Sequence, residues 1–571
     1  MLKRWWEQWL GRLEYELEAL RAAGIPYERD ENLFRQGVLL LKVYPTVEGR
    51  TLNLLAVFPD VYPYTRFEII APDLNLPHHQ NFLQKNLCLI GRSTENWTVR
   101  DTLAQYLVDR LPIVLKAALA SDCDGAIALE EQQAEPISVF YPYLPGALVV
   151  MDQTDIGGGK NDRGQLVVGL SKDDPPFPLR GAILEVSEKE GKMRSTASPE
   201  LSLLYPRRIR GGWVAIEEPI RTGDANEFLA ALASSDPQLK RFSPTQVGNF
   251  LIDVVGVRFP EEDAWRRKGM GWLFLVRSKD MKGARNPKET IYFARAARAS
   301  RADLGLRVPE LSSLINKTIA IVGLGSLGAP SAVQFARAGI GELRLADPDI
   351  VELGTTVRWP LGFSAAGKLK ADALREFIAS NYPYTRVKAS PHYVGTAMPE
   401  MDKRDATVLE DILDHADLVY DATAEVGIQF LLSEMAAERK IPYVCISSTP
   451  GSWGGLIARV TPEKPGCWGC IRRSLDDGSM ALPPQSPASP VQPAGCADPT
   501  FTGAGFDLDQ IAIAGVRLAV ASLCRDAREG YPDFDWDVGI ISLRHPDGRV
   551  KAPEWQTFPL HRHSSCDCGM R

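Results

Sequence analysis

The sequence predicts a multidomain protein with an N-terminal α+β domain, a β-rich middle domain and a C-terminal α/β domain. Two observations support this prediction. A chain of 571 residues is too long for one hydrophobic core. The pattern of helix-like and strand-like runs also differs among three parts of the chain. In the middle part, short apolar runs separated by Gly, Pro and Asp clusters dominate. The predicted domains are residues 1–122, 123–305 and 306–571.

The strongest local signal lies in the C-terminal domain, where an apolar run at 318–322 leads into a glycine loop and a helix. A second apolar run then ends on Asp347. This is the order of a βαβ nucleotide site, in which glycines let backbone N–H groups approach a phosphate chain. Asp347 is placed to accept hydrogen bonds from a ribose, and a purely structural strand-turn-helix is the alternative. The glycines of the loop are Gly323, Gly325 and Gly328.

Two basic residues, Arg358 and Lys370, follow this aspartate and favour ATP over a dinucleotide. A triphosphate that is attacked at its α-phosphorus needs extra positive charge as pyrophosphate leaves, whereas a dinucleotide carries only a pyrophosphate. Each basic residue alone would be interpreted as a solvated surface charge. Together with the glycine loop they predict an ATP site.

From about residue 311 onward, this pattern resembles the Rossmann-like adenylation domain of ubiquitin-activating enzymes and of the bacterial thiamine- and molybdopterin-synthesis adenylyltransferases of the ThiF type. The resemblance implies a homodimer that uses ATP and Mg²⁺ to activate the C-terminal glycine of a small carrier protein as an acyl-adenylate. Where the family has its magnesium aspartate this chain has Ala424, so Asp421 or Glu425 is expected to replace it. The asparagine that the family has shortly before its arginine is also absent from 354–358.

Composition argues against two classes of partner. The formal net charge is −7 and no long Lys/Arg tract occurs, so nucleic acid is not expected as a partner. No run of about 18 apolar residues and no signal peptide is seen, which predicts a cytoplasmic protein without membrane contact. Nine cysteines in that compartment are expected to be thiols, metal ligands or nucleophiles rather than disulfides.

The N-terminal domain begins with helical periodicity at 5–23, which Gly and Pro end. Strand-like runs follow at 37–44, 50–58 and 66–71, joined by short turns, and they predict an antiparallel meander. A long irregular segment comes next, and a final amphipathic helix is expected at 99–120.

This order of elements resembles that of ubiquitin-conjugating enzymes, whose irregular segment carries one cysteine. The resemblance is supported by Phe-Pro-Asp-Val-Tyr-Pro at 58–63, by His-Gln-Asn at 79–81 in place of the family's His-Pro-Asn, and by Cys88 and Trp97. It implies that Cys88 is the thioester nucleophile. It also implies that Asn81 stabilises the oxyanion formed when an amine attacks the thioester, or holds the loop that does so.

Two other interpretations compete at this segment. Cys88 stands between two leucines and could be a buried structural thiol, and His78 with His79 could bind a metal. No cysteine or carboxylate lies at ligand spacing from the histidines, so we expect a structural role for His79 in the active-site loop.

The middle domain is expected to be β-rich, with no catalytic constellation, and to space or orient its neighbours. The segment 157–160 lacks the spaced first glycine and the Ser or Thr of a P-loop, so a mobile hairpin turn is expected there. Strands are predicted at 147–151, 165–169, 181–186, 213–216, 272–276 and 289–293, and helices at 226–233 and 243–251.

A cysteine pair near the end of the chain predicts a metal site. Cys467 and Cys470 form a CxxC knuckle with the bite for one tetrahedral Zn²⁺, and a distant cysteine pair completes four sulfurs. The adenylating family has such a zinc, but its second pair is usually CxxC. Here the second pair is Cys566 and Cys568, which leaves the histidines at 561 and 563 as possible substitutes, and a redox CxxC is the competing interpretation.

A Pro/Ser/Ala segment at 481–494 precedes Cys496. Ubiquitin-activating enzymes have a flexible crossover after their CxxC that delivers a cysteine to the acyl-adenylate, which makes Cys496 the candidate nucleophile of the C-terminal domain. Its glycine and proline neighbours predict an exposed loop, where nearby positive charge can activate a thiol. Cys445 and Cys524 lie in apolar runs and are expected to be buried.

One chain with both domains resembles the fused activating–conjugating proteins of bacterial antiphage defence operons. The resemblance implies ATP-dependent adenylation of a protein C-terminus, a thioester relay through two cysteines and conjugation to a target lysine. The activated protein is expected to be either a cyclic-oligonucleotide synthase or a ubiquitin-like modifier. A sulfur-carrier adenylyltransferase, which needs only the nucleotide site, and a degenerate scaffold without catalysis are the alternatives.

Overall fold

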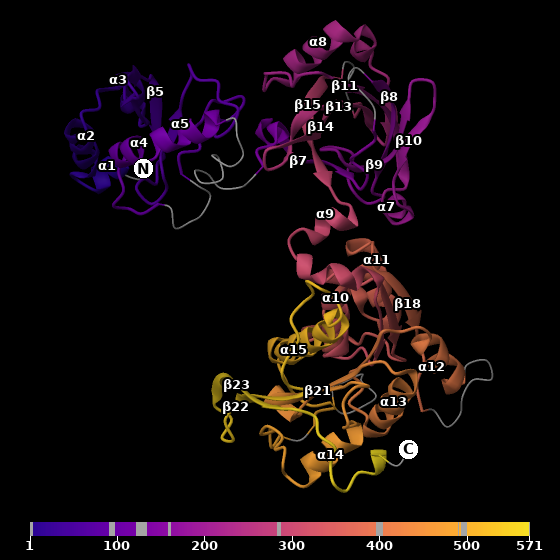
Figure 1. Cartoon of the computed structure of the whole chain (residues 1–571). Helices are drawn as coiled ribbons and strands as arrows, with labels where there is room; N and C mark the ends of the chain where they lie inside the picture. Colours follow the sequence, from indigo (N-terminus) through magenta and orange to yellow (C-terminus); the bar gives the residue numbers. More distant parts are fainter. Residues whose placement is uncertain are drawn as a thin grey trace. The chain divides into compact units, whose positions relative to one another are not determined.

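The structure is a computed structural model that describes residues 4–90, 97–120, 134–157, 162–282, 287–395, 404–488, 490–492 and 500–569 (Figure 1). The chain divides into two units, Met1–Arg298 and Ala299–Arg571. No helix in the described ranges is both long and apolar enough to cross a membrane.

The first unit begins with a four-stranded antiparallel sheet in the order β1-β2-β5-β6. Residues along β2 and β5 alternate between buried and partly exposed, which is the period of two expected for a sheet with one face on the core. The predicted meander is confirmed. The strands are β1 (Tyr27–Arg29), β2 (Leu39–Val43), β5 (Leu54–Phe58) and β6 (Glu68–Ile70), with a small hairpin of β3 (Thr46–Val47) and β4 (Arg50–Thr51) beside them.

Both long helices predicted in this region are divided in two. The first breaks at Gly11, which has a φ of 89°, and the second breaks at Arg110, two residues before Pro112, which lacks a backbone donor. Their buried side chains pack on the sheet in one core. The helices are α1 (Trp5–Gln8), α2 (Arg12–Ala22), α4 (Leu103–Asp109) and α5 (Leu111–Leu119), with a short α3 (Glu31–Gln36) between strands.

The second part of this unit is β-rich, as predicted. Its strands follow the order β9-β7-β15-β14-β13-β11-β8, and pairing of β8 with β9 closes them into a barrel around an apolar interior. Helix α8 (Ala225–Ser235), predicted at 226–233, packs on the outside. The barrel strands are β7 (Tyr143–Met151), β8 (Arg163–Leu170), β9 (Arg180–Glu188), β11 (Arg207–Ala215), β13 (Phe250–Ala264), β14 (Arg267–Asp280) and β15 (Glu289–Arg298).

The helix predicted at 243–251 is wrong. This segment forms β12 (Thr245–Val247) and the beginning of β13, joined by a turn in which Gly248 has a φ of 58°. Thr245 pairs with Ile252 in an antiparallel register. Over so short a run, the spacing of the apolar residues fits both the helical period of 3.6 and the strand period of two. The strand forms because it buries Ile252 in the barrel.

The second unit is built on an eight-stranded sheet in the order β18-β17-β16-β19-β20-β21-β22-β23. The first five strands are parallel and the last three are antiparallel. The predicted α/β class is confirmed. The strands are β16 (Thr318–Val322), β17 (Glu342–Ala346), β18 (Arg386–Ser390), β19 (Leu418–Asp421), β20 (Tyr443–Ser448), β21 (Gly454–Val460), β22 (Val538–Arg544) and β23 (Val550–Phe558).

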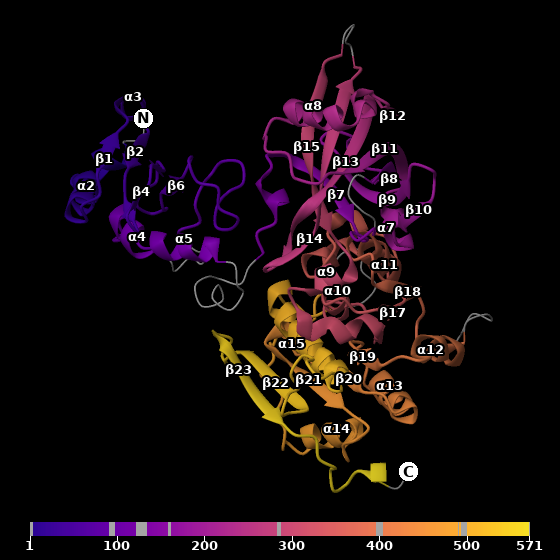
Figure 2. The ribbon, with the colours of Figure 1, turned by 45° about the horizontal axis from the view of Figure 1, so that its top comes forward.

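Helices cover both faces of this sheet, so each face has its own buried core (Figure 2). One face carries α10 (Gly328–Arg337), α11 (Lys370–Asn381) and α15 (Gly505–Cys524), and the other carries α12 (Asp405–Leu413), α13 (Val426–Arg439) and α14 (Trp468–Asp476). The strand order reverses at β16, which pairs with both β17 and β19. In open α/β sheets, ligands bind at the carboxyl ends of the strands at such a point.

Candidate functional sites

The glycine loop leaves β16 at the point where the strand order reverses. Gly323 has a φ of 86°, and a Cβ there would lie 2.8 Å from the backbone of Ala422 at the end of β19. A Cβ on Gly328 would lie 1.9 Å from the carbonyl oxygen of Gly323. No atom lies within 4 Å of a Cβ built on Gly325. Two glycines are therefore required by close backbone packing, and the third leaves open space where a phosphate can approach the backbone.

Asp347 joins this loop to the next segment. Its Oδ2 accepts the backbone N–H of Leu324 at 2.6 Å, and its Oδ1 accepts that of Asp349 at 2.9 Å. The Nζ of Lys370, at the start of α11, lies 2.6 Å from Oδ2 of Asp349 and 3.7 Å from Oδ1 of Asp347. Burial raises the pKa of Asp347, and the charge of Lys370 opposes this shift. The structure thus brings together the glycine loop, Asp347 and Lys370.

The guanidinium of Arg358 bonds to residues 500 and 501. Its Nη1 donates to the carbonyl of Phe501 at 2.8 Å, and its Nη2 donates to Oγ1 of Thr500 at 2.5 Å. Thr500 in turn exchanges two backbone hydrogen bonds with Val491. The next residue, Trp359, donates its indole N–H to the carbonyl of Leu324 in the glycine loop at 2.8 Å. Residues 358–359 therefore connect the glycine loop with the base of the segment that carries Cys496.

Cys496 itself lies outside the described residues, which end at 492 and resume at 500. Its predicted role as a nucleophile stays a prediction.

The proposed magnesium residue, Asp421, is fully buried at the end of β19. Its Oδ1 accepts the backbone N–H and the hydroxyl of Thr423, and its Oδ2 accepts the hydroxyl of Tyr443 at 2.9 Å. Burial raises the pKa of Asp421. Ala424 follows with a φ of 59°, and Glu425 is exposed at the N-cap of α13. Both oxygens of Asp421 thus hold this turn, whereas Glu425 offers a solvent-facing carboxylate.

The candidate conjugating site is a narrow loop in the first unit. Cys88 is exposed, which contradicts the alternative of a buried structural thiol. Its backbone N–H donates to the carbonyl of His79 at 2.8 Å, and Asn81 donates its own backbone N–H to Asn86 at 2.7 Å. The side-chain Oδ1 of Asn81 accepts two backbone N–H groups of the turn that follows, each at 2.8 Å. Asn81 therefore shapes the turn at 82–85 through its side-chain carbonyl oxygen, and Cys88 lies opposite His79 in the same loop.

Two carboxylates that lie far from this loop in the sequence hold it, and sequence reasoning missed both. Oε2 of Glu135 accepts the backbone N–H of His79 at 2.7 Å, and its Oε1 lies 3.3 Å from the ring Nδ1. Glu135 donates its own backbone N–H to Oε2 of Glu262, in β13, at 2.7 Å. Oε2 of Glu262 also lies 3.7 Å from Nδ1 of His78. The predicted structural role of His79 thus depends on residues 56 and 183 positions away; an acidic linker and an acidic strand end gave no specific signal.

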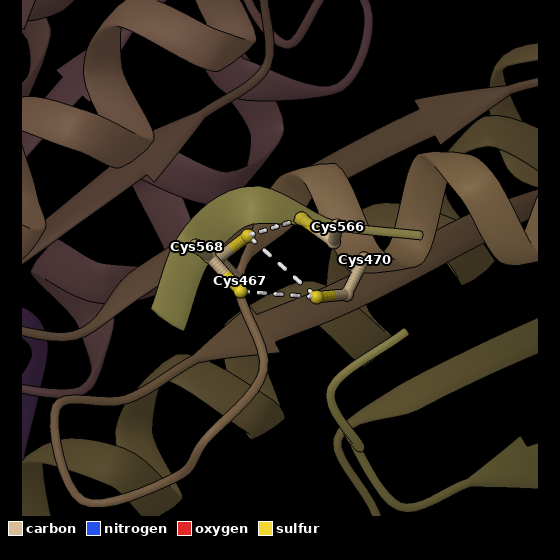
Figure 3. A group of neighbouring side chains, drawn as sticks. All are labelled: Cys467, Cys470, Cys566 and Cys568. Carbon is tan, nitrogen blue, oxygen red and sulfur yellow. Dashed lines mark hydrogen bonds between the residues drawn. The ribbon is translucent and has the colours of Figure 1, made fainter. Parts of the chain in front are cut away.

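The four predicted metal ligands converge on one point, although their two halves are about a hundred residues apart (Figure 3). The Sγ atoms of Cys467 and Cys470 are 3.7 Å apart, as are those of Cys467 and Cys566, and those of Cys470 and Cys568 are 3.5 Å apart. Four sulfurs at about 2.3 Å from a tetrahedral Zn²⁺ would be about 3.8 Å from one another. The donor set and its spacing therefore fit zinc.

The two histidines considered as substitute ligands are not part of this cluster. Nε2 of His563 lies 3.0 Å from a carboxylate oxygen of Asp477, and His561 is exposed. Cys445 and Cys524 are each 1% exposed, which confirms their predicted burial.

Comparisons with known proteins cover both units. The ThiF family matches residues 300–514, and Prokaryotic E2 family B matches residues 20–145. The uncharacterized protein y4oA of Sinorhizobium fredii is 30% identical over 99% of this chain and 97% of its own length. The uncharacterized protein y4qC of the same organism is 32% identical over 97% of this chain and 96% of its own. The chain belongs to this family of fused bacterial proteins, here called E2–ThiF fusions.

The E2–ThiF fusion therefore combines a ubiquitin-conjugating-like domain with a ubiquitin-activating-like adenylyltransferase, as the sequence predicts. It is an enzyme of ATP-dependent adenylation and ubiquitin-like conjugation, and adenylation implies ATP with Mg²⁺. Among solved structures, E. coli MccB with ATP is 16% identical with a TM-score of 0.33, over 47% of this chain and 71% of MccB.

Proposed function

We propose that this E2–ThiF fusion activates the C-terminus of a protein with ATP, carries it as a thioester on Cys496 and then on Cys88, and transfers it to a lysine of a target. One observation carries the proposal furthest. The glycine loop with Asp347 and Lys370 occurs in the same chain as an exposed Cys88 in a loop shaped by Asn81.

In the first step, the carboxylate of the activated protein attacks the α-phosphorus of ATP, and pyrophosphate leaves. The open backbone at Gly325 and the N-terminus of α10 suit the phosphates, and Asp347 suits the ribose hydroxyls. Lys370 and Arg358 supply positive charge for the departing pyrophosphate. Mg²⁺, when bound, neutralises phosphate charge. Asp421 or Glu425 would hold it, and the exposure of Glu425 favours that residue.

The later steps conserve the energy of the activated acyl group until an amide forms. The Cys496 thiolate attacks the acyl-adenylate and releases AMP, and the Cys88 thiolate then takes the acyl group and leaves Cys496 free. A lysine amine attacks the Cys88 thioester, an amide bond forms, and the Cys88 thiolate leaves. The amide of Asn81 is suited to stabilise the tetrahedral oxyanion in this last step.

The zinc site and the oligomeric state complete the proposal. The four cysteines would hold a structural Zn²⁺, which ties the end of the chain to α14. Val357, Phe363 and Phe506 expose 73–79% of their surface on the ThiF unit, which supports a homodimer. The cellular role proposed is antiphage defence, with a cyclic-oligonucleotide synthase or a ubiquitin-like modifier as the activated protein.

Pyrophosphate exchange tests the adenylation step. ATP should incorporate labelled pyrophosphate only when the activated protein is present, and candidates for that protein are the products of neighbouring reading frames. Lys370→Ala should lower the exchange rate by about 10-fold to 100-fold, because leaving-group charge is lost. Full exchange in Lys370→Ala would contradict this role, whereas Lys368→Ala, which removes an exposed neighbouring cation, should exchange normally.

A further inference from the structure

A cavity of about 410 Å³ adjoins the candidate conjugating loop in the first unit. One wall comes from residues 75–85, and the other comes from residues 135–140 and 218–221. Gln80 and Phe82, which flank Asn81 in the sequence, both line it. The cavity is therefore bordered by the turn that Asn81 shapes, and Cys88 follows three residues after Lys85 in the same loop.

Two cations in this cavity have neutral partners. Nζ of Lys85 lies 2.5 Å from the side-chain oxygen of Asn75, and the guanidinium of Arg221 lies 4.7 Å from the ring centre of Phe82. Among the described residues, neither cation has a carboxylate oxygen within 4.0 Å. Burial, followed by the charge of Arg221, lowers the pKa of Lys85. Two like charges thus share one partly apolar space without a counterion from the described part of the chain.

The two glutamates that also line the cavity do not neutralise these cations. Glu135 directs both carboxylate oxygens at His79. Glu218 is exposed. The remaining wall includes the side chains of Ile137 and Phe140, which exclude water from part of the space. An anionic group of side-chain size is therefore the ligand that this cavity complements in charge.

We propose that this cavity binds an acidic side chain of the protein that supplies the acceptor lysine, so that lysines with a nearby Glu or Asp are selected for conjugation. The inference rests on the proposed function of Cys88 as the last thioester carrier. The acceptor must reach Cys88 in this step, and Cys88 is exposed on the loop that forms one wall of the cavity. A carboxylate held between Lys85 and Arg221 would place the neighbouring acceptor amine at that loop.

Protection of Cys88 from alkylation by neutral iodoacetamide tests the proposal on the full chain, read by mass spectrometry of the peptide that contains Cys88. The probes are the capped peptides Leu-Lys-Ser-Glu and Leu-Lys-Ser-Gln. The Glu peptide should slow alkylation about threefold more than the Gln peptide, because only its side chain carries a charge opposite to those of Lys85 and Arg221. The double variant Lys85→Gln/Arg221→Gln should lose the difference. Lys116→Gln, which removes an exposed cation of α5 outside the cavity, should retain it.

Equal protection by both peptides would overturn the proposal, as would a difference that survives in the double variant. The measurement needs neither ATP nor an activated protein, so its outcome is independent of the proposed relay. If conjugation persists in Cys88→Ala, the proposed function fails whatever the peptides do. If conjugation requires Cys88 but the Glu peptide gives no extra protection, only the cavity proposal fails.

Discussion

The nucleotide site and the conjugating site of this protein are held in place in different ways. In the ThiF unit, the main contact between Asp347 and the glycine loop spans 23 residues and joins the ends of neighbouring parallel strands. In the first unit, His79 is bonded to Glu135 across 56 residues, and Glu135 is bonded to Glu262 across 127 more. The glycine loop is held by a local contact to its backbone, whereas the conjugating loop is held by side chains that are distant in the sequence. The contact that holds the first site follows from its motif, whereas the motif around Cys88 gives no sign of Glu135 and Glu262.

Glycine substitutions test the backbone character of the nucleotide site and should have the largest effect. Gly328→Ala places a methyl group 1.9 Å from the carbonyl oxygen of Gly323, so the loop must move. Pyrophosphate exchange should fall by about 100-fold or more, since the phosphate-facing N–H groups lose their alignment.

Gly325→Ala is the matched control for this substitution, because no protein atom lies within 4 Å of its added methyl group. It should leave the melting temperature of the ligand-free protein unchanged while it weakens ATP binding. Normal exchange in Gly328→Ala would show that the loop is not the phosphate site.

The cysteine cluster is a third type of site. Its two cysteine pairs are far apart in the sequence, yet their joining was predictable because four cysteines are a typical ligand set for zinc. Metal analysis should find one Zn²⁺ per chain. Cys566→Ser should lose most of this zinc and destabilise the ThiF unit by several kcal/mol, because metal binding is coupled to folding. His563→Ala should keep the metal, since its ring contacts Asp477 instead. A metal-free protein with an unchanged melting temperature would contradict a structural zinc.

Substitution of Glu135 tests whether a side chain distant in the sequence positions the loop that carries Cys88. Glu135→Ala removes the acceptor for the backbone N–H of His79, whose carbonyl in turn binds the N–H of Cys88. Transfer from Cys88 to lysine should slow by about 10-fold to 100-fold in single-turnover measurements, because small displacements of a reacting group are costly.

Glu135→Gln keeps a side-chain oxygen for that N–H and should restore most of the rate. Loading of Cys496 should be normal in both variants. An equal loss of rate in the alanine and glutamine variants would rule out positioning through this hydrogen bond.

The smallest expected effect is on the pH dependence of stability near the nucleotide site. Burial raises the pKa of Asp347 above its unfolded value, so the folded state holds a proton that the unfolded state has already lost. The free energy of unfolding therefore decreases as the pH rises from the pKa of Asp347 in the unfolded state, about 3.9, to its pKa in the folded state. Below this range the destabilisation is absent, and above it the destabilisation is complete.

Hydrogen exchange should therefore show that the protection of β16 and β17 falls as the pH rises through this range in the wild type. In Asp347→Asn, which cannot ionise at this position, the protection should not show this fall. Asp526→Asn, at an exposed position of the same unit, should follow the wild type. Parallel pH profiles for the wild type and Asp347→Asn would contradict the burial argument.

Much of the fold and part of the site could be predicted from sequence. The glycine loop, the two strands around it and the four cysteines have spacings that few other structures share. The segment at 243–251 was misassigned because its apolar spacing suited both a helix and a strand, and only burial in the barrel selects the strand. Glu135 and Glu262 could not be identified, since an acidic linker residue and an acidic strand residue are ordinary surface features until folding brings them to His79.

The order of thioester transfer is the most direct test of the account. The chain, co-expressed with the products of neighbouring reading frames and given ATP, can be analysed by intact mass and on non-reducing gels. Cys88→Ala should accumulate a thiol-labile adduct on Cys496, whereas Cys496→Ala should form no adduct at either cysteine. Normal charging of Cys88 in Cys496→Ala would contradict the relay, and full conjugation by Cys88→Ala would contradict the role of the E2-like domain.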